Sequence, residues 1–432
     1  MEAIALCTTL VWIVLGTAKW KWHPLVVLLL AALGLALALG NSPLDAIALI
    51  NEGFGGTVAR IGLIIILGAL LGEVLEKGGA TEHIALWIVA KLQRLPSTYA
   101  MSLIGYIVAI PVFCDAAFIL LSPLTKSMAR NTKTSGKALT VALSTGLFAP
   151  HVLVPPTPGP LAAAATLELE QLGVLIVAGG VLGLILVLVG GYFATRMAAR
   201  LRAENLPSVA VDSAQSSGLF KSLIPLVLPL VLIAGGTSMH GLEGSLGTII
   251  QTLSLPEVAL AIGVVSAVVL ASNNATPLSA MTGNALKSGG PVLMITAAGG
   301  ALGLVLKQIE VSAWLEGLAV PGALALVLPF TIAAVLKSAQ GSSTVAIITT
   351  ASMMLPLLPG LGLDTELGKV WTILALGTGA MTVSHANDSY FWIVSEMGGL
   401  TTNEAFQYHT KATALQGAVG LVLVVLSGWL VI

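Results

Sequence analysis

The sequence predicts an all-α polytopic membrane protein built from two inverted repeats with re-entrant hairpins and broken transmembrane helices. Of the 432 residues, 56% are apolar and 9% are charged, and the mean hydropathy is +0.98. Apolar runs near the length of about 18 residues that crosses a bilayer recur from end to end. Four longer apolar segments are interrupted by polar residues or prolines, which is typical of helices that break inside the membrane.

Eight apolar segments predict continuous spans, at residues 3–18, 24–40, 60–76, 172–195, 221–238, 257–272, 291–307 and 411–432. The first is not a cleaved signal, because its positive charges Lys19 and Lys21 follow the apolar run instead of preceding it. Two stretches that mix charged and apolar residues, 79–94 and 308–320, predict amphipathic helices at the membrane surface.

A polar linker at 201–220 separates two halves that present the same features in the same order. Gly68-Ala-Leu-Leu-Gly72 in one half resembles Gly299-Gly-Ala-Leu-Gly303 in the other. The predicted units are an N-terminal repeat at 1–200, with its first two helices as scaffold, a hairpin at 98–124 and a broken helix at 138–170, and a C-terminal repeat at 221–432, with a hairpin at 321–358 and a broken helix at 370–396.

The placement of positive charge predicts the topology. If the first hairpin enters and leaves from the cytoplasm and the second from outside, 15 of the 19 Lys and Arg residues fall in cytoplasmic loops, including the linker. This asymmetry is the one that membrane proteins show. It makes the two halves inverted copies, which is the architecture of secondary transporters.

The first broken helix is interrupted at 150–160, where five prolines occur in 11 residues. Proline removes a backbone donor and clashes with the preceding turn, so no regular helix runs through this segment. An extracellular loop is the alternative, but it would spoil the charge asymmetry downstream. We therefore expect substrate contacts from Thr157 and Gly159, and a group that titrates near neutral pH at His151.

The second broken helix is interrupted at 384–389 by Ser-His-Ala-Asn-Asp-Ser. Ionisable residues inside a membrane usually mark a transport pathway or a proton relay. His385 and Asp388 are therefore candidates for proton coupling, with Asn387 and Ser389 as substrate contacts. The alternative is a His–Asp hydrogen bond that only braces the fold.

The hairpin tips carry the remaining candidates. Helix ends at a tip expose unpaired N–H groups that suit a carboxylate. Asp115, the only carboxylate at the first tip, is a proton carrier if it is buried and a structural cap if it is wet. Lys337 could add positive charge at the second tip or extend to the membrane surface. Side chains at the second tip that could bond substrate hydroxyls are Ser338, Gln340, Ser342, Ser343 and Thr344.

Other polar residues receive less specific predictions. Glu73 is expected near a cytoplasmic helix end. The two cysteines, Cys7 and Cys114, indicate neither a disulfide framework nor a metal cluster. The histidines expected in solvated loops or interfacial helices are His23, His83, His240 and His409.

At its four interruptions the sequence resembles the gluconate permease (GntP) family of the ion transporter superfamily. The residues that carry the resemblance are Phe113–Pro123, His151–Pro160, Lys337–Ala346 and Ser384–Trp392. The resemblance implies proton symport of gluconate or related acids, and a scaffold domain, often dimeric, past which a transport domain moves. The superfamily's sodium-coupled carriers have Ser-Asn-Thr-type motifs at both tips. Here the first tip has Cys114-Asp115-Ala116, which favours protons.

The leading hypothesis is a bacterial inner-membrane symporter that imports gluconate or a similar sugar acid with protons. A D-serine or small 2-hydroxy-acid symporter is the second hypothesis. An intramembrane hydrolase using Asp115 and Asp388 lacks a supporting local signature, and a channel would not need two broken-helix sites. The expected partners are a small carboxylate, protons and the lipid bilayer, with a homodimer allowed. We expect no enzyme activity, cofactor, metal or nucleic acid.

Overall fold

The computed structural model describes residues 2–20, 22–80, 95–110, 113–132, 134–199, 219–238, 245–270, 276–306, 308–309, 322–386 and 388–432. Within these ranges the chain is helical and contains no β-strand. Five described helices are long and apolar enough to cross a membrane, or up to seven if each of two bent pairs is one span. The all-α class predicted from composition is therefore confirmed.

Most of the continuous helices follow the predicted spans, whereas α3 and α13 begin earlier and α11 was not predicted. Their apolar side chains point outward as well as inward, as expected of helices that face lipid. The bounds are α1 Glu2–Val14, α2 Pro24–Ala38, α3 Pro43–Lys77, α9 Leu172–Ala198, α10 Leu219–Ser238, α11 Ser245–Ser254, α12 Pro256–Leu270, α13 Leu278–Leu306 and α20 Lys411–Val431.

All four predicted interruptions are breaks between helices. In the first half, α5 (Ser97–Ala109) and α6 (Cys114–Thr132) form the hairpin, and α7 (Gly136–Leu153) and α8 (Pro158–Thr166) form the broken helix. In the second half the hairpin is α15 (Val327–Gln340) and α16 (Ser343–Met354), and the broken helix is α17 (Glu366–Met381) and α18 (Ser389–Gly398). The short elements are η1 Leu15–Lys19, η3 Gly322–Leu326, η4 Leu355–Leu357, η5 Pro359–Leu361, α19 Thr402–Ala405 and the π-helical turn η6 Phe406–Thr410.

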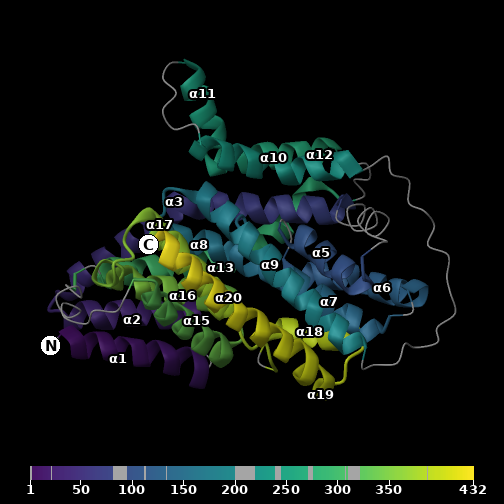
Figure 1. The fold of residues 1–432 in the computed structure, drawn as a ribbon. Helices are drawn as coiled ribbons and strands as arrows, with labels where there is room; N and C mark the ends of the chain where they lie inside the picture. Colours follow the sequence, from purple (N-terminus) through teal and green to yellow (C-terminus); the bar gives the residue numbers. More distant parts are fainter. Residues whose placement is uncertain are drawn as a thin grey trace.

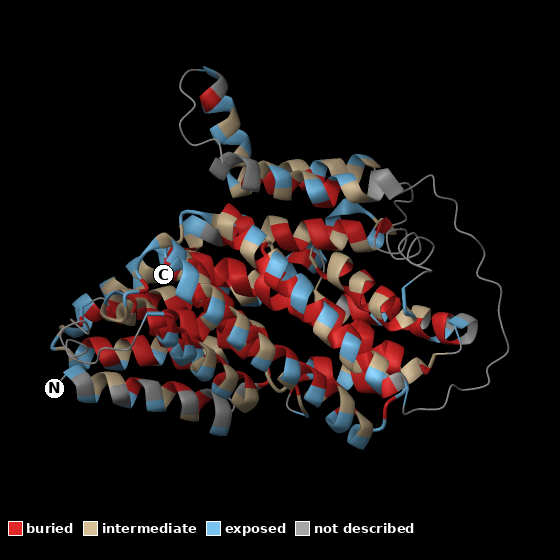
Figure 2. Cartoon of the chain, viewed as in Figure 1, coloured by how far each residue is buried: buried red, intermediate tan, exposed pale blue. Residues whose placement is uncertain are grey.

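The hairpins and broken helices of both halves share one core. The largest buried cluster combines side chains from α5, α6, α7 and α9 with side chains from α15, α16, α17, α18 and α20. The helices α10 and α12 lie side by side at the edge of the molecule, against α3, and α11 projects beyond them (Figure 1). Burial is densest in the central helices, whereas α10, α11 and α12 expose much of their surface (Figure 2). The two halves are thus interleaved.

Contacts between loops agree with the predicted topology. Lys137 Nζ lies 2.6 Å from Glu404 Oε1, and the two residues fall in the segments 125–137 and 397–411, which the predicted topology places on the cytoplasmic side. Lys369 Nζ donates to the Glu168 carbonyl at 2.9 Å, and both are expected on the opposite side. Because each contact joins loops assigned to the same side, the grouping of the loops is supported. Which group faces the cytoplasm stays a prediction.

Two spans are longer than predicted. The helix α3 begins at Pro43, where the sequence suggested a start at 60, and it bends by 45° between Arg60 and Gly62. The Ser42 hydroxyl accepts from the Asp45 N–H at 3.2 Å and caps this early start. The helix α13 begins at Leu278, where the expected start was 291, and runs along α3. The interfacial helices expected at 79–94 and 308–320 lie almost entirely outside the described residues.

Candidate functional site

The second hairpin turns over two residues. The helix α15 ends at Gly341, whose φ of 84° is the left-handed conformation that glycine adopts without a Cβ clash. The helix α16 then begins behind Ser342, whose hydroxyl accepts from the Val345 N–H at 3.3 Å. The tip therefore places the carboxyl end of one helix beside the amino end of the next.

A buried ion pair joins this hairpin to the second broken helix. Lys337, in the last turn of α15, places Nζ 2.5 Å from Asp388 Oδ2, and the two side chains are 1% and 6% exposed. The same Nζ donates to the Gly341 carbonyl at 2.7 Å. The Phe148 ring centroid lies 5.8 Å from the ammonium. Lys337 does not extend to the membrane surface, so that alternative is wrong.

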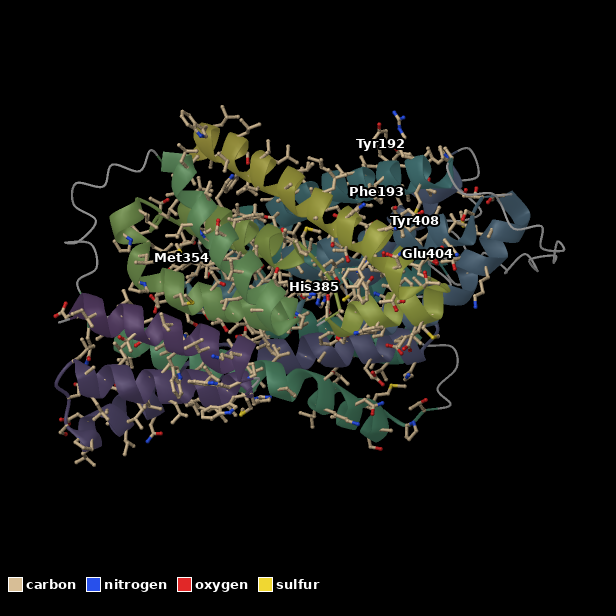
Figure 3. All side chains as sticks on the ribbon, turned by 90° about the horizontal axis from the view of Figure 1, so that it is seen from below. Tyr192, Phe193, Met354, His385, Glu404 and Tyr408 are labelled. Carbon is tan, nitrogen blue, oxygen red and sulfur yellow. The ribbon has the colours of Figure 1, made fainter. Side chains whose placement is uncertain are left out.

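Asp388 also holds the break in the second helix. Its Oδ1 accepts from the Tyr390 N–H at 3.1 Å and caps α18, and its Oδ2 accepts from the Ser384 hydroxyl at 2.5 Å. His385 Nε2 lies 3.1 Å from the Ser338 carbonyl at the end of α15. Figure 3 shows His385 among the helices in the interior of the molecule. Instead of pairing with each other, His385 and Asp388 thus contact two different residues of α15, Ser338 and Lys337.

A histidine that sequence reasoning placed in solvent completes this network. His409, in η6, is fully buried, with Nε2 3.1 Å from the Ser384 hydroxyl and Nδ1 3.1 Å from the Ser144 hydroxyl on α7. The Tyr390 hydroxyl donates to the Ser144 carbonyl at 2.9 Å. The prediction for His409 was wrong because the apolar run of α20 was taken to begin at 411. His23, by contrast, is exposed as expected.

The first hairpin meets the second broken helix. Asp115 lies in the first turn of α6, where a negative charge is favoured, and is half-buried. Its carboxylate accepts the Cys114 thiol at 3.6 Å and lies within interaction range of the Ser389 side chain. This residue of the first half is therefore in contact with the start of α18.

The first broken helix meets the second hairpin in the corresponding way. A Cβ added to Gly159 would lie 3.0 Å from the Ile347 side chain and 3.7 Å from the Thr344 Cα. The neighbouring Thr157 is buried and donates to the Val154 carbonyl at 2.5 Å. Each hairpin tip thus contacts the broken helix of the other half.

His151 lies at the end of α7, near the centre of this arrangement. It is 6% exposed, and its ring stacks on Phe148 at 6.5 Å between centroids, at 18°. It interacts electrostatically with Lys337 and Asp388. Among the described residues, Nδ1 is buried without a hydrogen-bond partner. A buried nitrogen of this kind is available to a proton or to a substrate hydroxyl.

The structure therefore gathers most of the predicted residues around the four breaks. Ser343 is buried, Ser342, Thr344 and Ser338 are half-buried, and Ser389 is exposed. Glu73, near the end of α3, accepts from Asn284 Nδ2 at 2.7 Å. Asn387 and the side chain of Gln340 lie outside what the structure describes, as do His83 and His240. No group of His, Cys, Asp or Glu that could hold a metal occurs in the described part of the chain.

Comparison with known proteins identifies the family. The model of the GntP family permeases matches residues 1–430. The chain belongs to the GntP permease family. It is 32% identical to the D-serine transporter DsdX of Escherichia coli strain CFT073, over 96% of each chain. It is 29% identical to the gluconate permease of Pseudomonas aeruginosa, over 97% of this chain and 95% of that protein.

Solved structures place this GntP permease in a known fold. The Alcanivorax borkumensis YdaH transporter superposes with a TM-score of 0.66 at 18% identity, covering 94% of this chain and 98% of that one. Neisseria gonorrhoeae MtrF gives a TM-score of 0.66 at 13% identity, covering 96% of each chain. The protein is a multi-pass inner-membrane transporter and not an enzyme, and the hydrolase hypothesis is discarded.

Proposed function

We propose that this permease imports gluconate or a similar small sugar acid by proton symport. The observation that carries the proposal is the buried Lys337–Asp388 pair, held where a hairpin tip and a broken helix of the second half meet. A cation at this depth can attract a carboxylate, and a carboxylate at this depth can carry a proton. Both functions are available within one cluster.

The surrounding groups fit a hydroxylated substrate. The substrate would lie against the second tip and the two breaks. The proposed substrate contacts are Thr157, Gly159, Ser338, Gln340, Ser342, Ser343, Thr344, Asn387 and Ser389. The proposed proton-coupling groups are Asp115, His151, His385 and Asp388. Hydroxyl groups at the half-buried positions Ser342 and Thr344 can donate to and accept from a polyol.

A D-serine or small 2-hydroxy-acid symporter is the second candidate. It is favoured by the 32% identity to a protein named as a D-serine transporter, compared with 29% to one named as a gluconate permease. A homodimer stays a prediction.

Uptake into proteoliposomes tests the proposal. With the interior alkaline, we expect labelled gluconate to accumulate above equilibrium, and an uncoupler to abolish the accumulation. Unlabelled sugar acids, glycerate and D-serine are then compared as competitors. Accumulation that an uncoupler leaves unchanged would refute proton symport, and stronger competition by D-serine would favour the second candidate.

A further inference from the structure

The buried ion pair has an electrostatic property that bears on coupling. In the present conformation Lys337 and Asp388 neutralise each other, and both are removed from water. A second charge brought into such a site without compensation is strongly disfavoured, because the surroundings solvate it poorly. Entry of a carboxylate into this site therefore requires an equal change of charge elsewhere in the site.

Resting on the proposed function, we propose that Lys337 and Asp388 are an electroneutral charge-exchange centre. The substrate carboxylate replaces Asp388 as the counter-ion of Lys337, and Asp388 takes up one proton from water. The Lys337–Asp388 ion pair breaks, an O–H bond forms on the Asp388 carboxyl group, and an ion pair between Lys337 and the substrate forms. The charges of Lys337, Asp388 and the bound carboxylate sum to zero before and after, so each monoanion enters with one proton.

The geometry around Lys337 accommodates this exchange. An ammonium donates three hydrogen bonds, and in the described residues two of them go to Asp388 and Gly341. Ser342 and Thr344, at the adjacent amino end of α16, are half-buried, so this side of the pair is not fully covered. The amino end of a helix also favours an anion. A carboxylate entering beside α16 would meet Lys337 and unpaired N–H groups together.

Asp388 has partners for its protonated form as well. Ser384 Oγ, at 2.5 Å from Oδ2, can accept the new O–H as readily as it now donates. The other titratable groups that act on Asp388 come from each neighbouring element: Cys114 and Asp115 on α6, His151 on α7, Lys337 on α15, Tyr390 on α18 and His409 on η6. Lys337 is the cation in direct contact with Asp388. When Lys337 pairs with the substrate carboxylate instead, Asp388 loses its nearest positive charge, and this loss favours its protonation.

Whether a substrate needs a proton in order to bind at this centre depends on the charge of the substrate. Gluconate is a monoanion, so its binding leaves a neutral site only if Asp388 is protonated. D-Serine is a zwitterion, whose ammonium can pair with Asp388 while its carboxylate pairs with Lys337. Binding of D-serine therefore requires no proton at this centre.

Titration calorimetry of the full-length protein in detergent tests the exchange. Gluconate and D-serine are the probes, each titrated in two buffers of different ionisation enthalpy, which gives the number of protons taken up per ligand. We expect one proton per gluconate and none per D-serine. At pH values where Asp388 is protonated in the gluconate complex but not in the free protein, gluconate affinity should fall about tenfold for each pH unit that the pH rises.

The Asp388→Asn variant isolates the carboxylate. It imitates the protonated form, so we expect it to bind gluconate without proton uptake and without this pH dependence. Asp364→Asn, at an exposed carboxylate, is the matched control and should behave as the wild type.

Three outcomes separate the inference from the proposed function. Gluconate binding without proton uptake by the wild type, or unchanged proton uptake by Asp388→Asn, would overturn the exchange but leave carboxylate transport standing. If Asp388→Asn does not fold, the wild-type comparison of the two probes still decides. Binding of neither probe would overturn the proposed function and the exchange together.

Discussion

At the scale of residues, Lys337 and Asp388 form the most buried ion pair among the described residues. Removing one partner of a buried pair typically costs about 3–5 kcal/mol, because the other charge is left unpaired. We predict that Lys337→Met destabilises the protein by about this amount, and that Lys337→Met/Asp388→Asn loses less than the sum of the two single variants. Thermal unfolding in detergent measures the cycle.

The partly exposed pair Lys369–Glu366, at 3.1 Å, is the matched control. Pairs near the surface contribute about 0–1 kcal/mol, so the corresponding cycle of Lys369→Met and Glu366→Gln should show little coupling. Additive losses at Lys337 and Asp388 would mean that the pair does not hold the site together.

Ser384 determines the direction of the hydrogen bonds around Asp388. Its single hydrogen is donated to Asp388 Oδ2, so it must accept from His409 Nε2–H. His409 Nδ1 then accepts from the Ser144 hydroxyl, which must turn toward it from the Val141 carbonyl at 3.0 Å. Protonation of Asp388 would reverse each donor in turn, so the state of Asp388 sets the tautomer of His409.

We predict that Ser384→Ala lowers stability by about 1.5–3 kcal/mol, the range for a hydrogen bond to a charged group. The substitution also leaves His409 Nε2–H without its acceptor. Ser266→Ala is the control, since that hydroxyl donates to the Gly263 carbonyl of its own helix. Equal melting temperatures for the two variants would contradict the prediction.

At the scale of elements, the two broken helices cross at a glycine of α17. Gly377 on α17 packs directly against the Val152 carbonyl near the end of α7, where an added Cβ would overlap the oxygen. The crossing sets the positions of His151 and of the break that follows α17. A close backbone approach of this kind is a common reason for glycine in membrane helices.

We predict that Gly377→Ala separates α7 from α17 and costs about 1–3 kcal/mol through the steric clash. The ratio of folded to unfolded protein should fall about 5- to 160-fold, and transport should fall with it. Gly34→Ala in α2 is the matched control, because nothing lies within 4 Å of its added Cβ. That change should be neutral or slightly stabilising. Size-exclusion profiles and uptake by the two variants are compared; a normal profile for Gly377→Ala would show that the crossing can relax.

The sequence was sufficient to predict all four helix breaks, because prolines and polar residues interrupt apolar runs that are otherwise long enough to span. It could not predict the pairing of Lys337 with Asp388, since 51 positions separate them and either side chain has several plausible partners. The burial of His409 was also missed. That burial depends on Ser144 and Ser384 approaching from other helices, and no local pattern encodes it. The early start of α3 did have a local signal, Ser42-Pro43 followed by Asp45.

At the scale of the whole molecule, the halves exchange contacts across the core. Asp115 of the first hairpin reaches Ser389 of the second broken helix, and Gly159 of the first broken helix lies against Thr344 of the second hairpin. This reciprocal arrangement follows if the halves are inverted copies, because each hairpin then enters from the side opposite to the other. Inversion in the membrane has a direct consequence for surface accessibility.

We predict that Lys126 and Asp364 lie on opposite sides of the membrane, with Asp364 outside. Both are exposed; Lys126 lies toward the end of α6 in the first hairpin, and Asp364 follows the second hairpin. After Cys7 and Cys114 are replaced by Ala, a membrane-impermeant maleimide applied to intact cells should label Asp364→Cys and not Lys126→Cys. Permeabilised cells, in which both positions react, are the control. Labelling of both variants in intact cells would contradict the inverted topology, because the two hairpins would then open to the same side. The 15 positive charges assigned to the cytoplasm would then no longer be concentrated on one side of the membrane.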